Sequence, residues 1–182
     1  MVHFVGAGPG ASDLITVRGD RLLREADVVI YAGSLVNPEL LKGCRTDCAV
    51  YDSAYMTLEE VLEVIRDAER RGEMTVRLHT GDPSIYGAIR EQMDALDRMG
   101  IAYDVCPGVS SFCGAAAALN LEYTLPEVSQ SVIITRMEQN KGSGKKKSIQ
   151  SFAAHQATMV LFLSTGLLEE LSGELIVGGY KE

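Results

Sequence analysis

Short apolar runs alternate along this chain with longer stretches in which apolar residues recur at helical spacing. The runs have the length of buried strands. They cover residues 2–5, 28–31, 74–79 and 101–106. Between two of them, Val61, Ile65 and Ala68 share one helical face. This alternation predicts an α/β domain with a mainly parallel sheet that is covered by helices on both faces.

Capping residues mark the expected helix ends. Ser12 or Asp13 begins a helix that we expect to reach residue 25. Thr57 and Glu60 have the spacing of a capping box, and Gly72 ends the helix that follows. Further helices are expected at residues 37–41, 84–99 and 114–118.

The pattern starts again at Ser131, with fewer strands. Strands are expected at residues 132–135 and 158–163, and helices at 148–155 and 167–176. Two strands are too few for an independently stable sheet. We therefore expect an N-terminal α/β domain over residues 1–122. Residues 123–182 are expected to form the start of a C-terminal α/β domain that is incomplete in this chain.

Composition narrows the class of protein. The chain has 182 residues, 46% of them hydrophobic, which is enough for a packed core. A net charge of -8 and a pI near 4.9 argue against a broad surface for nucleic acid or anionic membrane. The longest apolar run, residues 159–163, is far shorter than the roughly 20 residues of a membrane helix, and the N-terminus lacks a signal pattern. We expect a cytoplasmic protein.

Cysteines and histidines do not predict a metal centre. The four cysteines have neither the close pairs of a zinc site nor the density of a disulfide scaffold, so we expect reduced, mostly buried thiols. They are Cys44, Cys48, Cys106 and Cys113. His3 and His79 lie inside apolar runs, which indicates core or edge histidines with satisfied hydrogen bonds. The third histidine, His155, is far from both along the chain.

Three glycine-bearing turns each follow an apolar run. They are Gly6-Ala7-Gly8-Pro9-Gly10, Thr80-Gly81-Asp82-Pro83-Ser84-Ile85-Tyr86-Gly87 and Pro107-Gly108-Val109-Ser110-Ser111. In an α/β sheet such turns lie at the carboxyl ends of strands, where the ligand crevice lies. Together they predict one shared cleft.

The first turn matches the dinucleotide-binding pattern formally, with Ala11 in the last place. That mechanism presents backbone N–H groups to a pyrophosphate, and Pro9 has no such donor. It also needs an acidic residue at the end of the second strand, where this chain has Tyr31-Ala32-Gly33. A tight strand-to-helix connection without a ligand stays open for this turn.

A second glycine-rich stretch, Gly142-Ser143-Gly144-Lys145, looks like a phosphate-binding P-loop. The spacing fails, because the upstream glycine would fall at Gln139 and the magnesium-binding hydroxyl at Lys146. We interpret this stretch as a basic surface loop whose charge can attract an anionic substrate locally.

The turn Thr80-Gly81-Asp82-Pro83 is more specific. It places an accessible glycine backbone, a carboxylate and a rigid proline between a strand and a helix. Such a turn suits a cationic, polar ligand better than a phosphate. The alternative is that Asp82 or Ser84 only caps the helix.

Taken together, these motifs resemble those of the tetrapyrrole methylases, which use S-adenosylmethionine to methylate uroporphyrinogen III and later corrin precursors. The resemblance covers essentially the whole chain and is strongest to the members that methylate precorrin-4 or cobalt-precorrin-4 at C-11. The motifs that carry it are Val5-Gly6-Ala7-Gly8-Pro9-Gly10, Leu14-Ile15-Thr16-Val17-Arg18-Gly19, Tyr31-Ala32-Gly33-Ser34-Leu35-Val36, Thr80 through Gly87, Pro107 through Ser111, Tyr123-Thr124-Leu125-Pro126, Thr135-Arg136-Met137-Glu138 and Ala154-His155-Gln156-Ala157-Thr158.

The resemblance implies a two-domain α/β fold, distinct from the common methyltransferase fold. It places S-adenosylmethionine in the cleft between the domains, with the tetrapyrrole above it, and implies a homodimer. The residues implied to line the cofactor site are Pro9, Thr80, Gly81, Asp82, Ile85, Ser110, Ser111 and Leu163, with Tyr86 and Met137 added from their places beside these motifs.

The implied reaction is methyl transfer from a sulfonium to a ring carbon, so positioning and desolvation supply most of the catalysis. Backbone oxygens and the Asp82 carboxylate would favour the positively charged cofactor. Arg136, Arg18 and Lys141 are candidate donors to substrate carboxylates. The sequence identifies no catalytic base.

Members of this family continue beyond the position of Glu182 with strands and a helix that complete the second domain. The resemblance therefore implies a half-formed C-terminal domain here. Two alternatives stay open: a dinucleotide-dependent oxidoreductase, and a truncated, non-catalytic remnant that binds a tetrapyrrole or dimerises.

Overall fold

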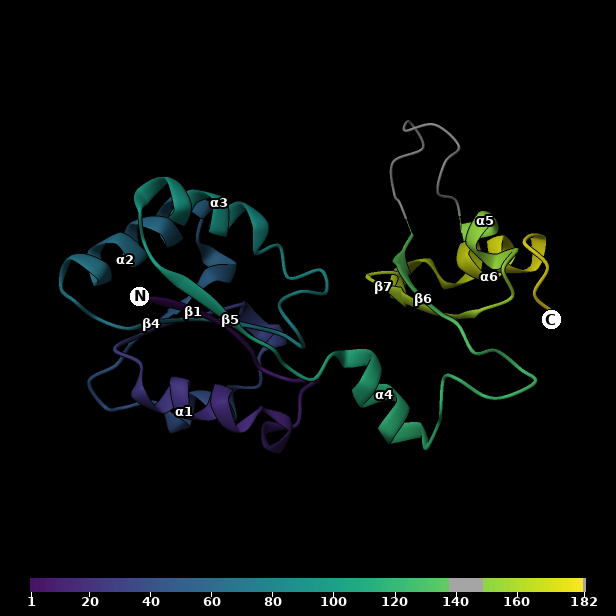
Figure 1. Cartoon of the computed structure of the whole chain (residues 1–182), viewed down its shortest axis with the longest axis horizontal. Helices are drawn as coiled ribbons and strands as arrows, with labels where there is room; N and C mark the ends of the chain where they lie inside the picture. The colour runs from purple at the N-terminus through teal and green to yellow at the C-terminus, as the bar shows by residue number, and fades with distance from the viewer. Residues whose placement is uncertain (138–148, 182) are drawn as a thin grey trace. The chain divides into compact units, whose positions relative to one another are not determined.

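The chain folds into two compact units. The computed structural model describes residues 1–137 and 149–181, and the units are Met1–Ala115 and Ala116–Glu182 (Figure 1). Each unit is described by itself below. The boundary that the sequence suggests, between residues 122 and 123, stays a prediction.

The first unit is built on a five-stranded sheet in the order β3-β2-β4-β1-β5. The strands are β1 (Val2–Gly6), β2 (Val28–Tyr31), β3 (Ala49–Asp52), β4 (Thr75–His79) and β5 (Tyr103–Cys106). All neighbouring strands pair in parallel. The expected parallel sheet is therefore confirmed, and its carboxyl ends all lie on one edge.

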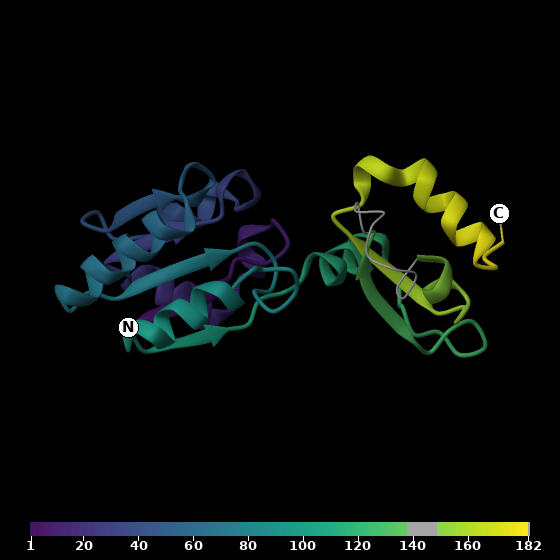
Figure 2. The same ribbon diagram turned by 90° about the horizontal axis from the view of Figure 1, so that it is seen from above.

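Helices cover both faces of this sheet (Figures 1 and 2). They are α1 (Val17–Glu25) on one face, and α2 (Leu58–Arg70) and α3 (Arg90–Met99) on the other. The Thr57 and Glu60 capping box is confirmed, because each side chain accepts the other residue's backbone N–H, at 3.2 and 2.7 Å. α1 begins later than expected, since Thr16 rather than Ser12 or Asp13 caps it.

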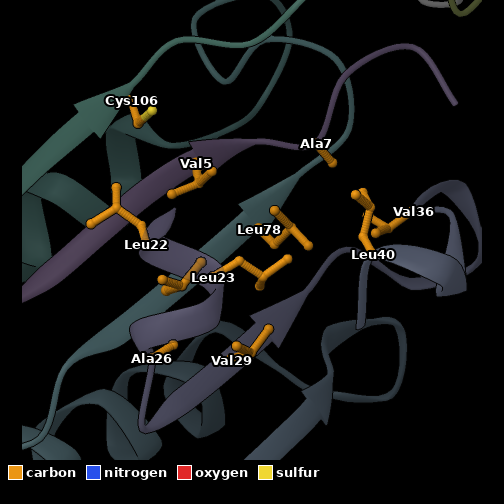
Figure 3. Packing of buried hydrophobic residues seen from close by; sticks show 11 residues of the cluster. Val5, Ala7, Leu22, Leu23, Ala26, Val29, Val36, Leu40, Leu78 and Cys106 are labelled. Carbon is orange, nitrogen blue, oxygen red and sulfur yellow. The ribbon is translucent and has the colours of Figure 1, made fainter. Parts of the chain in front are cut away.

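The core forms around β1, which lies between β4 and β5 and is buried along its whole length. Successive side chains of a strand point to opposite faces. Val5 therefore packs with Leu22 and Leu23 of α1 on one face (Figure 3), while Phe4 lies in the cluster with Ile65 and Leu96 on the other.

Two elements of this unit differ from the sequence-based expectation. The strand β3 was not expected, because it is an outer strand in which Val50 and Tyr51 are 44% and 37% exposed and the other two residues are half-buried. The helix expected at residues 84–99 starts only at Arg90. Tyr86 and Ala88 have φ angles of 54° and 51°, and residues in the left-handed conformation cannot continue a right-handed helix.

The second unit holds a parallel pair of strands, β6 (Val132–Arg136) and β7 (Thr158–Phe162). Its helices are α5 (Ile149–Ala153) and α6 (Leu168–Val177), which pack on each other, and the last four residues of α4 (Ser111–Leu119), whose first five residues belong to the first unit. The expected strands are therefore present. Among the described residues, this sheet has two strands.

The four cysteines are free thiols of differing exposure. Cys106 is buried, Cys44 and Cys48 are half-buried, and Cys113 is exposed. Burial, the charge of Cys44 and a hydrogen bond to it raise the pKa of Cys48 to about 11, so this thiol stays protonated at neutral pH. Among the described residues, no group of three histidine, cysteine or acidic side chains is placed to hold a metal ion.

Arg77, the middle residue of β4, carries a buried guanidinium. Arg77 of β4 donates to Gln92 Oε1, to the Ile30 carbonyl and to Ser53 Oγ, each at 3.0 Å. Burial lowers the pKa of Arg77 to about 10, so it remains charged at neutral pH. The side chain thereby joins β2, α3 and the turn after β3.

The two buried histidines differ in their hydrogen bonding. His3 is satisfied through Nδ1, which lies 2.7 Å from Asp104 Oδ1. His79 is buried beside the ring of Phe4, and its Nε2 has no partner among the described residues, so the expectation of satisfied hydrogen bonds is wrong for that atom. Burial, together with the charge of Arg77, lowers the pKa of His79 to about 3.

No helix in residues 1–137 and 149–181 has both the length and the apolar character needed to cross a membrane.

The buried histidine makes stability depend on pH. The unfolded chain protonates His79 below about pH 6.5, whereas the native state resists protonation until about pH 3. The stability that His79 contributes is therefore complete above pH 6.5 and is lost as the pH falls toward 3. Between pH 6.5 and 5, urea unfolding should show a loss of about 2 kcal/mol from this source.

The variant His79→Phe should remove that part of the pH dependence, whereas His155→Phe, which changes an exposed histidine, should retain it. An identical loss of stability between pH 6.5 and 5 in the wild type and in His79→Phe would contradict the assignment.

Candidate functional site

The three glycine turns meet at the carboxyl ends of β4, β1 and β5, which are neighbours in the sheet. Gly81 N donates to the Gly8 carbonyl at 2.9 Å, and Gly8 N donates back to the Gly81 carbonyl at 3.3 Å. Ala7 N also donates to the His79 carbonyl at 2.7 Å. The first two turns are thus joined by backbone hydrogen bonds.

The third turn packs against the other two at distances that only glycine allows. A Cβ atom added at Gly108 would lie 2.1 Å from the Gly81 carbonyl oxygen and 2.7 Å from the Gly6 Cα. A Cβ added at Gly6 would lie 2.5 Å from the Gly108 Cα. The contacting atoms are backbone atoms, so they cannot move aside as a flexible side chain would. We call the contact of Gly6, Gly81 and Gly108 the glycine junction.

Pro9 packs on the start of α4. It is half-buried, and a Cβ added at Gly114 would lie 2.6 Å from the Pro9 Cβ. The turn is held from its other side by Asn37, whose Nδ2 donates to the Gly10 carbonyl at 2.7 Å. Asn37 was expected only at the start of a short helix, and a contact across 27 residues leaves no signal in the local pattern.

Asp82, in the second turn, connects this turn to the third through a hydrogen bond. Its Oδ2 accepts a hydrogen bond from Gly108 N at 2.9 Å, and its Oδ1 accepts from Ser84 N at 2.8 Å and from the Ser84 hydroxyl. Burial alone would raise the pKa of Asp82, but these hydrogen bonds outweigh it, and the net shift is downward. The carboxylate is therefore ionised at neutral pH.

The rest of the second turn follows Asp82 closely. Ile85 is half-buried, and its backbone N–H donates to the Asp82 carbonyl at 3.1 Å. Tyr86 is 43% exposed and has a φ of 54°, and Ala88, two residues later, has a φ of 51°. Non-glycine residues in this conformation store strain, and such strain clusters at functional sites.

Thr80 and the two serines complete the set in the first unit. Thr80 is half-buried next to the buried Gly81. Ser110 is 7% exposed, and its carbonyl accepts hydrogen bonds from Cys113 N and Gly114 N at 3.0 and 3.2 Å as α4 begins. Ser111 is the first residue of α4. The structure therefore gathers the eight expected site residues of this unit on the edge formed by the glycine junction.

The two expected site residues of the second unit lie at the carboxyl edge of its own sheet. Met137 follows β6, and Leu163 follows β7. Ser164 joins them, since its hydroxyl accepts from Met137 N at 3.2 Å and donates to the Phe162 carbonyl at 2.8 Å. Leu163 has a φ of 54° and is 66% exposed. Ser164 lies two residues after the end of β7, and the local sequence pattern does not mark it as part of the site.

Two of the three candidate donors to substrate carboxylates lie in the described part of the chain, and both are exposed. Arg18 is exposed in α1, and Arg136 is exposed at the end of β6. Lys141 and the basic loop of residues 142–147 lie outside the described residues.

A small cavity opens beside the site, at the carboxyl ends of β2 and β3. Its volume is about 190 Å³, and Tyr31, Asp52 and Leu41 contribute to its lining. Tyr31 donates its hydroxyl hydrogen bond to Asp52 Oδ2 at 3.2 Å, and burial, followed by this carboxylate, raises the pKa of Tyr31. Ligand cavities usually measure about 300–1,000 Å³, so this one has room for only part of a ligand. The sequence did not predict this cavity, because Asp52 in its lining belongs to β3, a strand that the apolar pattern does not mark.

The glycine junction allows a direct test. Gly108→Ala should destabilise the first unit by about 3 kcal/mol, because its Cβ meets fixed backbone atoms. Gly173→Ala is the matched control, since an added Cβ meets nothing within 4 Å in α6, and it should stabilise that helix by about 1 kcal/mol. Urea unfolding followed by circular dichroism measures both, and equal stability of the two variants would contradict the close contact.

Comparison with known proteins places this site in context. The family model of Tetrapyrrole (Corrin/Porphyrin) Methylases matches residues 1–181. The chain is 51% identical over 181 residues to the cobalt-precorrin-4 C(11)-methyltransferase of Methanocaldococcus jannaschii, covering 100% of this chain and 70% of that protein. It is 42% identical to the precorrin-4 C(11)-methyltransferase of Mycobacterium tuberculosis, covering 99% of this chain and 72% of that protein.

Solved structures agree with these relatives. A cobalt precorrin-4 methyltransferase superimposes with a TM-score of 0.95 at 44% identity, covering 100% of this chain and 76% of that one. The uroporphyrin-III C-methyl transferase of Thermus thermophilus, complexed with S-adenosylhomocysteine, gives a TM-score of 0.77 at 28% identity, with 99% and 73% covered. The family model, the relatives and the shared fold lead to the same conclusion: the chain belongs to the tetrapyrrole methylase family.

Proposed function

We propose that this chain transfers a methyl group from S-adenosylmethionine to C-11 of a corrin precursor, precorrin-4 or cobalt-precorrin-4, in cobalamin biosynthesis. The observation that carries the proposal is the match over the full chain to the cobalt-precorrin-4 C(11)-methyltransferase at 51% identity. Nothing in the comparisons favours a dinucleotide-dependent oxidoreductase or a non-catalytic remnant.

The site residues fit a sulfonium cofactor better than a dinucleotide. The ten expected residues include one ionised carboxylate, that of Asp82, and no lysine, arginine or histidine. A pyrophosphate would need cationic side chains or free backbone N–H groups, and Pro9 has none. We therefore infer that the ten expected residues contact S-adenosylmethionine. They are Pro9, Thr80, Gly81, Asp82, Ile85, Tyr86, Ser110, Ser111, Met137 and Leu163.

The chemistry requires a carbon–carbon bond to form as the carbon–sulfur bond breaks, with the electron pair passing to sulfur. S-adenosylmethionine, when bound, supplies the electrophilic methyl group on a sulfonium. The protein's part is to align the reacting atoms and to exclude water. Ile85, Met137 and Leu163 offer apolar contact for that purpose, while the glycine junction fixes the loops that present the polar groups.

We further infer a homodimer that works in the cytoplasm with a tetrapyrrole as its substrate. The family supports the substrate, and the dimer is what the resemblance to its members implies. The cytoplasmic location rests on the short apolar runs of the sequence. Sedimentation velocity measures the oligomeric state directly.

Cofactor binding separates the proposed activity from the oxidoreductase. Isothermal titration calorimetry should detect binding of S-adenosylmethionine and no binding of NADH or NADPH. Incubation with methyl-labelled S-adenosylmethionine should then transfer label to precorrin-4 or to cobalt-precorrin-4. Binding of a nicotinamide cofactor alone would refute the proposal, and cofactor binding without transfer to either substrate would favour the non-catalytic remnant.

Leu163 offers a test in the second unit. It is 66% exposed, so Leu163→Ala should leave the midpoint of thermal unfolding unchanged while weakening S-adenosylmethionine binding by about tenfold, as expected for one lost apolar contact of about 1.4 kcal/mol. Leu168→Ala is the matched control, because Leu168 is 62% exposed in α6 and should not affect binding. Equal affinities of the two variants would remove Leu163 from the site.

A further inference from the structure

Asp82 is the only ionised side chain among the proposed cofactor contacts, and its oxygens already have partners within the protein. We propose that Asp82 is a positioning residue, which supports cofactor binding by holding Gly108 in place and not by attracting the sulfonium. The inference rests on the proposed function, because the cofactor in question is S-adenosylmethionine.

The hydrogen bonds of Asp82 leave little of the carboxylate for a ligand. Oδ2 accepts from Gly108 N at 2.9 Å, and Oδ1 accepts from Ser84 N at 2.8 Å and from the Ser84 hydroxyl. A carboxylate offers about four acceptor positions. Three of them are occupied by donors of the protein itself, so the negative charge is already compensated by these donors.

The bond to Gly108 has a consequence beyond Asp82. Gly108 lies so close to Gly81 and Gly6 that an added Cβ would come within 2.1 Å of the Gly81 carbonyl oxygen and 2.7 Å of the Gly6 Cα. The chain leaving Gly108 reaches the buried Ser110 two residues later, and α4 begins at the next residue, Ser111. Asp82 therefore fixes the start of the third turn relative to the second, across 26 residues of sequence.

The Gly81 carbonyl strengthens this interpretation. It points into the glycine junction, where it accepts from Gly8 N at 3.3 Å and lies against Gly108. Both the Gly81 carbonyl oxygen and the Asp82 carboxylate therefore bond to groups of the protein itself. Both groups hold the loops together, and the binding surface is made by the parts of the turns that they orient.

Comparing two ligands separates positioning from charge attraction. S-adenosylmethionine carries a sulfonium, whereas S-adenosylhomocysteine has a neutral thioether and is otherwise the same apart from the methyl group. If Asp82 positions Gly108, Asp82→Asn should weaken both ligands equally, by about tenfold for the loss of one charge-assisted hydrogen bond. If Asp82 attracts the sulfonium, only S-adenosylmethionine should lose affinity, and that result would overturn the inference.

Two further variants serve as controls in the same calorimetric titrations. Asp13→Asn removes one exposed negative charge from the short 3-10 helix that follows the first turn, without touching the bond to Gly108, and it should leave both affinities within twofold of the wild type. Ser84→Ala removes one donor to Oδ1 and keeps the bond to Gly108, so its effect should be smaller than that of Asp82→Asn and again equal for both ligands.

A measurement on the wild-type chain needs neither a variant nor a cofactor. NMR spectroscopy can detect the hydrogen bond from Gly108 N to Asp82 Oδ2 directly. In a sample labelled with ¹⁵N and ¹³C, this bond should give a scalar coupling between the Gly108 amide nitrogen and the Asp82 carboxyl carbon. Absence of the coupling would overturn the inference even if Asp82→Asn did not fold. A wild-type chain that shows the coupling but binds neither ligand would refute the proposed function, and with it the cofactor part of the inference, while leaving the contact itself established.

Discussion

The close approach of three backbone segments at Gly6, Gly81 and Gly108 is the constraint on which the site depends. The strands β4, β1 and β5 are parallel neighbours, so their carboxyl ends emerge side by side. The loops that leave them must then turn within van der Waals distance of one another, and a single Cβ at this point would meet fixed backbone atoms. The Asp82 carboxylate is tied to this contact, because its Oδ2 accepts a hydrogen bond from Gly108 N.

Local physics made much of the fold predictable. The central strands are buried on both faces, so their apolar runs stand out from the sequence, and the capping box of Thr57 and Glu60 marks one helix start to the residue. β3 escaped prediction because an outer strand with Tyr51 and Asp52 exposed or half-buried carries no such run. The late start of α3 escaped it because the left-handed residues there are a tyrosine and an alanine, which composition does not mark as helix-breaking.

The site could be predicted only in part from local sequence patterns. The glycine turns could be located because each follows a strand, but the site residues within them came from the family resemblance. The partners that hold these residues are distant in sequence: Gly108 for Asp82, Asn37 for Gly10, and Ser164 for Met137. Each such pair depends on which strands are neighbours in a sheet, and a single sequence does not state that order.

The two outer strands bear on how copies of the chain associate. β3 and β5 are short, and each carries a carboxylate, Asp52 on one and Asp104 on the other. Exposed strand edges invite pairing with another chain, and short, charged edges oppose it. Between molecules of net charge -8, joining two such edges would bring like charges together in an already repulsive encounter. The sheet of the first unit is therefore a poor template for its own extension, and an assembly of two copies would be favoured on other surfaces.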